Sequence, residues 1–299
     1  MGFRHSIRAV HEVTGHPLNT DRKFGAILDY LRWNIGRRLL RTEYVIPLAN
    51  EATIILSDQQ NYATLAYTCS LWDFEEMIFL VHLLRSDDLF LDIGANVGSY
   101  SVLASAIAGA RTIAFEPVPA TYNQLLRNVR ANGIEDRTRC LQICLGDLEG
   151  TISMTADRGG LNYVISEGWK SGATVDVPMR RLDDVLADES SRFVKIDTEG
   201  FELNVLRGGT RTFSNPELMA LVVELNGSGN RYGHSDEEVH AEIIRFGFAA
   251  CKYDCKTRTL TPISTFDRTK INRLYVRDIS CASRRVAAGP TVRVRRHEF

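Results

Sequence analysis

The sequence predicts an α/β fold with a mostly parallel sheet and helices on both of its faces. In the stretch from Leu89 to Gly98, an apolar run ends in an acid, and a loop of small residues then leads into a helical pattern. A second apolar run, residues 111–115, ends at Glu116-Pro117. Strand-like and helical patterns alternate from there onward, which is the order of a parallel sheet whose crossovers are helices.

Residues 1–70 are expected to form an N-terminal extension with a helix and a hairpin. Residues 1–20 show little periodicity and should be partly loose. Residues 21–40 predict an amphipathic helix, because apolar side chains recur there at helical spacing: Phe24, Ile27, Leu28, Leu31, Ile35 and Leu39. The runs 43–48 and 52–56 predict the hairpin. The extension should either cover the substrate side of a site or form an oligomer contact.

Residues 71–280 are expected to form the main domain, in which a helix over 71–84 leads into a first strand at 89–93. Further strands are predicted at 111–115, 138–145, 175–180, 192–197, 219–225, 248–253 and 273–277, helices at 97–108, 119–132 and 235–246, and a hairpin return at 151–155. No helix separates the last two strands, so the final strand can run antiparallel. We expect a seven-stranded, mostly parallel sheet with an antiparallel final strand.

Two further segments stand out by composition. Residues 156–172 are polar and rich in glycine and include Trp169, which predicts a long loop of the kind that often acts as a lid. Residues 281–299 contain five arginines and few apolar side chains, so we expect a basic, disordered tail.

The overall composition limits the classes of function. The net charge of −1 over 299 residues creates no bulk field that would draw the chain to nucleic acid or a membrane. No apolar run reaches membrane-spanning length, and the N-terminus lacks the apolar stretch of a signal peptide. Six scattered cysteines without a C-x-x-C pair fit a reduced compartment. These features predict a cytoplasmic protein.

The loop after the first strand is typical of a nucleotide-type cofactor site. Gly94 and Gly98 let the backbone approach a ligand closely, and free N–H groups of the next helix favour a carboxylate or phosphate. The loop is neither a dinucleotide fingerprint, since Asn96 and Ser99 occupy glycine positions, nor a P-loop, since it has no lysine. S-adenosylmethionine (SAM), with one carboxylate and one positive centre, fits better. The spacing Asp92-x-Gly94-x-Asn96-x-Gly98 resembles the D-x-G-x-G-x-G loop of Rossmann-like methyltransferases.

Glu116 ends the second strand about 20 residues after the loop, where an acid commonly holds a ribose diol. Its two acceptor oxygens match two hydroxyl donors. NAD sites use the same arrangement, so this residue alone does not separate SAM from NAD. A solvated glutamate at a strand end is the other interpretation.

A second chemical cluster follows the strand at 192–197. Alternation places Lys195 and Asp197 on one face, and Asp197 and Glu199 then fall at the carboxyl edge of the sheet, where α/β enzymes place their sites. Helix capping accounts for Glu202 and in part for Glu199, but it does not explain Lys195 together with Asp197.

Glu224 and His234 are further candidates near the same edge. Glu224 ends an apolar run, where a charge is costly unless it is used or paired, and pairing with Lys195 is the alternative. His234 lies in the loop past that strand and is either a base or simply solvated. Three carboxylates near one edge could hold a divalent ion, but no ligand spacing defines one and we predict no metal.

Residues 92–98, Glu116-Pro117 and above all the run Lys195–Glu202 resemble the FkbM family of SAM-dependent methyltransferases, over roughly residues 89–250. The resemblance implies a Rossmann-like class I methyltransferase fold, SAM as cofactor and methyl transfer to oxygen, often on a sugar or a polyketide-type hydroxyl. It also places Leu145 and Gly146 beside the adenine.

A hydroxyl acceptor is a weak nucleophile, so a base should lie within hydrogen-bond reach of it. Asp197 and Glu199 are the leading candidates for base or acceptor positioning, followed by Glu224 and His234. The expected cofactor-binding residues are Asp92, Gly94, Asn96, Gly98, Glu116, Leu145 and Gly146. We expect a small-molecule or glycan acceptor and no nucleic acid, and a homo-oligomer stays open. N-methylation, an NAD-dependent oxidoreductase and a non-catalytic binding module are the alternatives.

Overall fold

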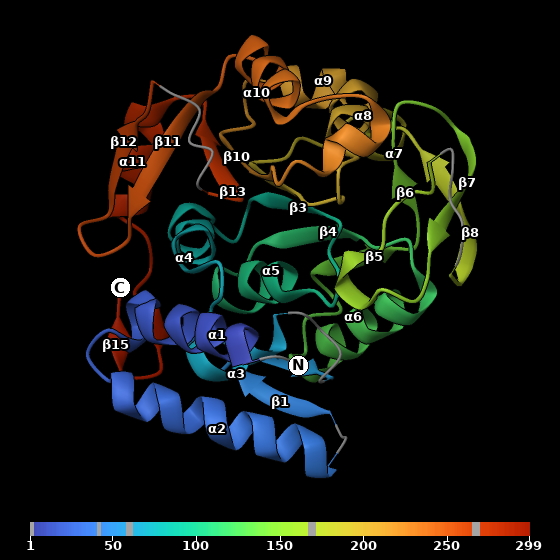
Figure 1. The fold of residues 1–299 in the computed structure, drawn as a ribbon. Coiled ribbons are helices and arrows are strands. Elements are labelled where there is room, and N and C mark those ends of the chain that lie inside the picture. The colour runs from blue at the N-terminus through green and yellow to red at the C-terminus, as the bar shows by residue number, and fades with distance from the viewer. Residues whose placement is uncertain (1–2, 41–42, 58–61, 167–171, 265–269) are drawn as a thin grey trace.

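An eight-stranded sheet forms the centre of the computed structural model, which describes residues 3–40, 43–57, 62–166, 172–264 and 270–299, with side chains from residue 8 onward (Figure 1). The strand order is β12-β11-β13-β10-β9-β3-β4-β5. The strands are β3 (Leu89–Ile93), β4 (Arg111–Phe115), β5 (Thr138–Leu141), β9 (Phe193–Ile196), β10 (Ala220–Glu224), β11 (Ala249–Asp254), β12 (Thr259–Pro262) and β13 (Asn272–Val276).

The sheet confirms the predicted fold class. Strands β5, β4, β3, β9 and β10 pair in parallel, and β13 inserts antiparallel between β10 and β11. Apart from β12, the described sheet has seven strands, and β13 is the one that runs opposite to the other six. The extra strand β12 pairs antiparallel with β11 at the edge, and only Leu260 of its four residues is buried, so it carries little apolar signal.

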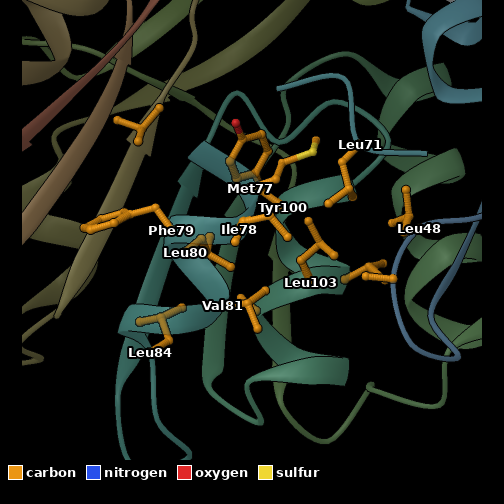
Figure 2. Packing of buried hydrophobic residues seen from close by; sticks show 14 of the residues in the cluster. Leu48, Leu71, Met77, Ile78, Phe79, Leu80, Val81, Leu84, Tyr100 and Leu103 are labelled. Carbon is orange, nitrogen blue, oxygen red and sulfur yellow. The ribbon is translucent and has the colours of Figure 1, made fainter. Parts of the chain in front are cut away.

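Helices cover both faces of this sheet because neighbouring strand residues point to opposite sides. One face packs against α4 (Phe74–Leu83), α5 (Ser99–Val102), the π-helical turn η2 (Leu103–Ile107) and α6 (Pro119–Ala131). The other packs against α7 (Leu182–Leu186), α8 (Glu202–Gly208), α9 (Thr210–Ser214) and α10 (Asp236–Arg245). Figure 2 shows α4 surrounded by apolar neighbours such as Tyr100 and Leu103, so this helix is part of the core. Among the described residues, no helix is long and apolar enough to cross a membrane.

The predicted strand 138–145 is in fact two strands in different sheets. After β5 the chain leaves the main sheet at the exposed Gln142, and β6 (Cys144–Leu145) pairs with β8 (Thr174–Arg180) instead. β8 also pairs antiparallel with β7 (Gly150–Thr155), the predicted hairpin return. Between them lies the short helix η3 (Gly159–Leu161), while Trp169 of the predicted lid lies outside the described residues.

Residues 1–20 were expected to be partly loose, but their described part is regular. It forms α1 (Phe3–Gly15) and η1 (Pro17–Asn19). The reason is a buried polar anchor: the Asn19 amide donates to the carbonyls of Val13 (3.0 Å) and Thr68 (3.2 Å), which ties this segment to α3 (Ala63–Cys69). Too few apolar residues recur in this segment for periodicity to reveal that attachment.

The remaining elements of the extension, a helix and a hairpin, match their predictions. They are α2 (Lys23–Leu40) and the antiparallel pair β1 (Tyr44–Pro47) and β2 (Thr53–Leu56). The side chains of α2 that face inward are Ala26 and Trp33. Most of the predicted apolar stripe of α2 is therefore on the outside of the molecule. The division into 1–70 and 71–280 stays a prediction.

The prediction of a disordered tail was also wrong. Residues 279–299 form α11 (Ile279–Ala287), β14 (Arg293–Val294) and β15 (His297–Glu298). Three buried valines anchor the segment in the core: Val286, Val292 and Val294. Arg285 donates to the Leu83 carbonyl (2.7 Å) and pairs with the buried Asp88. Arginine-rich composition suggested disorder, but a few valines and buried charge pairs are enough to fix this segment.

Because Val286 is fully buried, we expect Val286→Ala to lower the free energy of unfolding by about 2 kcal/mol, the transfer and cavity cost of losing two methyl groups from a core. Denaturant unfolding measures this change. Val45→Ala is the matched control, since Val45 is exposed and should change little. Equal and negligible effects of the two substitutions would contradict a packed C-terminal segment.

Candidate active site

Two adjoining cavities lie at the carboxyl ends of β3, β4, β9 and β10. The first cavity extends from the end of β4 toward β6 and encloses about 600 Å³ of space, including its open mouth. The second cavity lies between the start of α4 and the ends of β9 and β10 and encloses about 690 Å³ on the same basis. Of the described residues, five line both cavities and form their common wall: Gly94, Asn96, Gly160, Asp197 and Glu199. The two predicted clusters therefore meet at one place.

The glycine loop has the tight geometry that its sequence predicts. Gly94 adopts φ +75°, and a Cβ at this position would lie 1.8 Å from the Asp197 carbonyl oxygen. Only glycine lets β3 and β9 end this close together. Gly98 has φ +89°, and a Cβ there would meet the side chain of Leu125 on α6. Its role is packing of the helix against the loop.

The predicted cradle of free N–H groups is largely engaged within the protein. The amides of Gly94 and Ala95 donate to the Phe115 carbonyl at 3.0 and 2.9 Å, and the Asn96 amide donates to the Glu116 carboxylate at 3.0 Å. The loop thus fixes the backbone and presents the Asn96 side chain to both cavities.

Asp92 lies behind the loop. Its Oδ2 accepts hydrogen bonds from the amide (3.0 Å) and hydroxyl (2.6 Å) of Ser101, so it holds the first turn of α5 in place. Burial raises the pKa of Asp92 despite the nearby ammonium of Lys195. Asp92, Gly98, Gly146 and His234 are not among the described residues that line the two cavities.

Glu116 lies in the wall of the first cavity, at the end of β4 as predicted. One carboxylate oxygen accepts from the Val118 amide (3.0 Å) and the other from the Asn96 amide (3.0 Å). Burial raises the pKa of Glu116 to about 7, although these two amides oppose the shift. Each oxygen keeps a further lone pair for an incoming donor.

The rest of the first cavity is mostly apolar. Leu145 lies in its wall, and Gly146 lies behind it, where a Cβ would come within 2.7 Å of the Met179 sulfur. Sequence reasoning missed Val118, Met154 and Phe201, which line the cavity from three different elements. Single apolar residues in a loop, a hairpin and a helix cap form no recognisable pattern.

Lys195 and Asp197 form an ion pair at 2.8 Å, which confirms that alternation places them on one face. Burial opposes the charge of each group. The ammonium of Lys195 nevertheless holds the pKa of Asp197 below its usual range, and the carboxylates of Asp197 and Asp92 hold the pKa of Lys195 above its own. Asp197 is thus an ionised carboxylate even in a buried site.

Glu224 hydrogen-bonds Asp197, which in turn holds the ion pair with Lys195. Burial, together with the charge of Asp197, raises the pKa of Glu224 far above its usual range, so its carboxyl keeps its proton and hydrogen-bonds Asp197. The Asn226 amide donates to Glu224 at 3.1 Å. Two carboxyl groups this close share one negative charge because both cannot ionise.

Glu199 lies on a strained turn that directs it into the common wall. It adopts φ +53°, and Glu202 stabilises the turn through one oxygen that accepts from the Thr198 amide, the Thr198 hydroxyl and the Gly200 amide, each at 3.0 Å. Glu202 lies in the first turn of α8, as the capping interpretation requires, but its hydrogen bonds hold the turn before the helix. Burial and the charge of Asp197 raise the pKa of Glu199 to about 7.

His234 packs beneath the loop that follows β10. A Cβ on Gly229 would lie 2.6 Å from the His234 ring, and Tyr232 stacks beside it. Burial lowers the pKa of His234. The ring supports the loop and does not reach the cavities.

The second cavity includes residues that sequence reasoning missed, and one of them, Tyr62, comes from the extension. Tyr62 and Trp72 stack with ring centroids 4.5 Å apart, and the Tyr62 hydroxyl donates to the Asn96 side chain at 3.2 Å. Asp73 accepts from the Tyr100 hydroxyl at 3.1 Å, and burial raises the pKa of Asp73 to about 6. Trp72 and Asp73 fall at the start of the predicted helix 71–84, where no motif marks them as cavity-lining residues.

Carboxylate oxygens of Asp197, Glu199 and Glu224 lie within 4.8 Å of one another, close enough to share a divalent ion. Lys195 and the proton on Glu224 already compensate much of their charge. The expectation that this site uses no metal stays a prediction.

Comparison with known proteins agrees with the resemblance seen in the sequence. The sequence profile of the Methyltransferase FkbM domain matches residues 92–255. Methyltransferase sdnD of Sordaria araneosa is 27% identical over 200 residues, which cover 54% of this chain and 77% of that one. The hexuronic acid methyltransferase AglP of Haloferax volcanii is 30% identical over 153 residues, which cover 49% of this chain and 59% of that one.

Among solved structures, a Streptococcus mutans protein described as a methyltransferase in complex with SAH aligns over 68% of this chain and 96% of its own. The TM-score is 0.41 at 10% identity, a likeness too low to support any inference.

Proposed function

The chain belongs to the FkbM methyltransferase family, and on this basis we propose that it transfers a methyl group from SAM to a hydroxyl group of a sugar, glycan or secondary-metabolite acceptor. One observation carries the proposal. A cavity suited to a nucleoside and a second cavity with a polar, aromatic lining share a wall formed by the glycine loop, Asp197 and Glu199. Methyl transfer requires the donor carbon and the acceptor oxygen to approach within about 3 Å in line, and two cavities that adjoin at these residues allow that approach.

The first cavity fits SAM by the chemistry of its lining. Glu116 offers lone pairs to the two ribose hydroxyls, and Val118, Met154 and Phe201 offer an apolar enclosure for adenine. When bound, SAM supplies a methyl group on a positively charged sulfur, and the sulfur keeps the electron pair of the broken carbon–sulfur bond. Asn96 and Gly94 belong to the common wall, where the two cavities adjoin.

The acceptor hydroxyl loses its proton as the new carbon–oxygen bond forms, and we assign this proton to Glu199. A base works best when its pKa lies near the working pH, and the pKa of Glu199 is about 7. Asp197 is a weaker base because Lys195 and the Glu224 proton stabilise its charge. We assign Asp197 and Glu224 to positioning the acceptor by hydrogen bonds.

The stacked rings of Tyr62 and Trp72 support an acceptor with a flat or weakly polar face, such as a sugar ring. The related Haloferax protein is named for its action on a hexuronic acid. We expect Trp72→Ala to raise the KM for the acceptor roughly tenfold, the loss of one aromatic contact, and to leave the SAM dissociation constant unchanged. Steady-state kinetics with each substrate varied in turn measures both. Trp72→Phe is the matched variant and should retain most of the affinity, and a loss confined to SAM binding would contradict the assignment.

The function is tested by incubating the protein with SAM and a panel of glycosides, uronates, polyketide-type alcohols and amines. Mass spectrometry should detect the gain of one CH₂ unit on a hydroxyl-bearing acceptor. If only the amines gain a methyl group, the proposed reaction is N-methylation and the assignment to a hydroxyl acceptor is wrong. Calorimetry should detect binding of SAM and none of NAD, and the reverse result would overturn the proposal.

A further inference from the structure

We infer that the outward face of α2 docks on an anionic membrane surface and lies parallel to it. The helix forms the lower boundary of the molecule in Figure 1, and α1, α3 and β1 all lie on its inner side. Its inner face is anchored by Trp33, which stacks on Tyr67 and donates to the Thr64 hydroxyl. The helix is therefore held firmly, and its outer face is displayed in one orientation.

The outer face of α2 is an apolar stripe, defined here as Phe24, Leu28, Leu31, Ile35 and Leu39. Every one of these side chains is exposed, from 37% for Leu28 to 77% for Leu39. They recur at spacings of three and four residues, so they form one continuous row. A helix of this length extends about 27 Å. Large apolar side chains in a contiguous exposed row mark a docking site.

Basic side chains flank the stripe on both sides. Arg32 and Arg38 lie three residues before and after Ile35, which places them about 60° to opposite sides of it. Both are exposed, and Lys23 is exposed at the start of the helix. An apolar row between arginines is the arrangement of helices that lie in a membrane interface, where the guanidinium groups reach lipid phosphates.

The one acidic residue of α2 does not neutralise this charge. Asp29 already pairs with Arg22 at 2.6 Å, and Arg32 and Arg295 approach it at 3.7 Å, so three guanidinium groups surround one carboxylate. Arg22, which directly precedes α2, lines a groove together with Arg295 and two more arginines of the C-terminal segment. Asp21 pairs with one of these arginines, Arg296, at 2.7 Å. Residues 21–40 carry five basic and two acidic side chains, so the local charge is positive although the whole chain carries a net charge of −1.

This charge argues against a second copy of the chain as the occupant. A two-fold contact brings the same patch of both copies together. The stripe of one copy would then meet the stripe of the other with arginines on both rims and no free acid on α2 to pair with them. Anionic lipid complements the rim, and lipid chains complement the stripe.

The test is co-sedimentation of the full chain with phosphatidylcholine vesicles that contain or lack phosphatidylserine. We expect binding only to the vesicles that contain phosphatidylserine. Binding should weaken at about 1 M salt, where the screening length for charges falls to about 3 Å. The double variant Leu31→Gln/Ile35→Gln should lower the partition coefficient for vesicles roughly tenfold or more, since it removes two apolar side chains that the membrane would bury. The double variant Arg32→Gln/Arg38→Gln should remove the preference for phosphatidylserine.

Leu148→Gln/Ile244→Gln is the matched control, because these side chains are exposed elsewhere on the surface and should leave vesicle binding unchanged. All these variants lie outside the cavities, so SAM binding reports that each is folded. Absence of vesicle binding by the original chain overturns the inference. So does binding that survives the stripe variant, and so does a dimer in analytical ultracentrifugation that the stripe variant dissociates.

Discussion

Replacing Glu116 with glutamine is expected to weaken SAM binding by roughly a hundredfold or more, because two hydrogen bonds from ribose to a charged acceptor are lost or reversed. Glu116 is buried in the first cavity, and backbone amides hold both of its oxygens in place. Glutamine has the same shape but offers a donor where the ribose also offers one. Isothermal calorimetry measures the change, with Glu149→Gln, an exposed site, as the control.

The same residue predicts how SAM affinity depends on pH. Burial raises the pKa of Glu116 to about 7 in the free protein, and the ribose hydroxyls favour its ionised form. SAM affinity should therefore rise as pH increases through about 7 and level off above it, with proton release on binding at lower pH. Thermal unfolding should first show that the Glu116→Gln variant is folded. An unchanged SAM affinity in that folded variant would contradict this role of Glu116.

Replacing Glu199 with glutamine is expected to lower kcat roughly a hundredfold to ten-thousandfold, the usual contribution of a positioned base. The SAM dissociation constant should change little, because the ribose contact lies at Glu116. Single-turnover kinetics at saturating SAM and acceptor isolates the chemical step. Glu217→Gln is the matched control, since Glu217 is exposed away from both cavities.

At saturating SAM, the pH profile of kcat should rise through about 7, because Glu199 must be ionised to accept a proton and its pKa is raised to that range. Saturation removes the contribution of Glu116 to the profile. The rise should disappear in Glu199→Gln. A profile that is identical in the variant would assign the titration to another group and remove Glu199 as the base.

Much of this site follows from local sequence patterns. The alternation of a strand places Lys195 and Asp197 on one face, and their 2.8 Å ion pair follows from that. The position of Glu116 at a strand end also predicts its place in the first cavity. These features depend on a few neighbouring residues and on the rule that parallel strands end at the same edge.

Other features depend on contacts that the sequence does not announce. The shared proton between Glu224 and Asp197 requires β10 to lie beside β9 in a register that pairs Val223 with Ile196. Asp92 resembles a ligand-binding acid, yet its strand position turns it toward Ser101. Tyr62 reaches the second cavity from the extension without any motif.

Composition was the least reliable guide. The arginines after Ser280 suggested a disordered tail, but Val286, Val292 and Val294 bury completely. The stripe on α2 has the period of a core-facing helix, but Trp33 on the opposite side takes that place. Periodicity locates an apolar face, and only the tertiary structure tells whether that face is covered.

A crystal structure of the chain with S-adenosylhomocysteine tests the central claim most directly. The account predicts ribose oxygens within hydrogen-bond distance of Glu116, and the sulfur facing Asp197 and Glu199 where the two cavities adjoin. Nucleoside density outside the first cavity, or a sulfur directed away from those carboxylates, would contradict it.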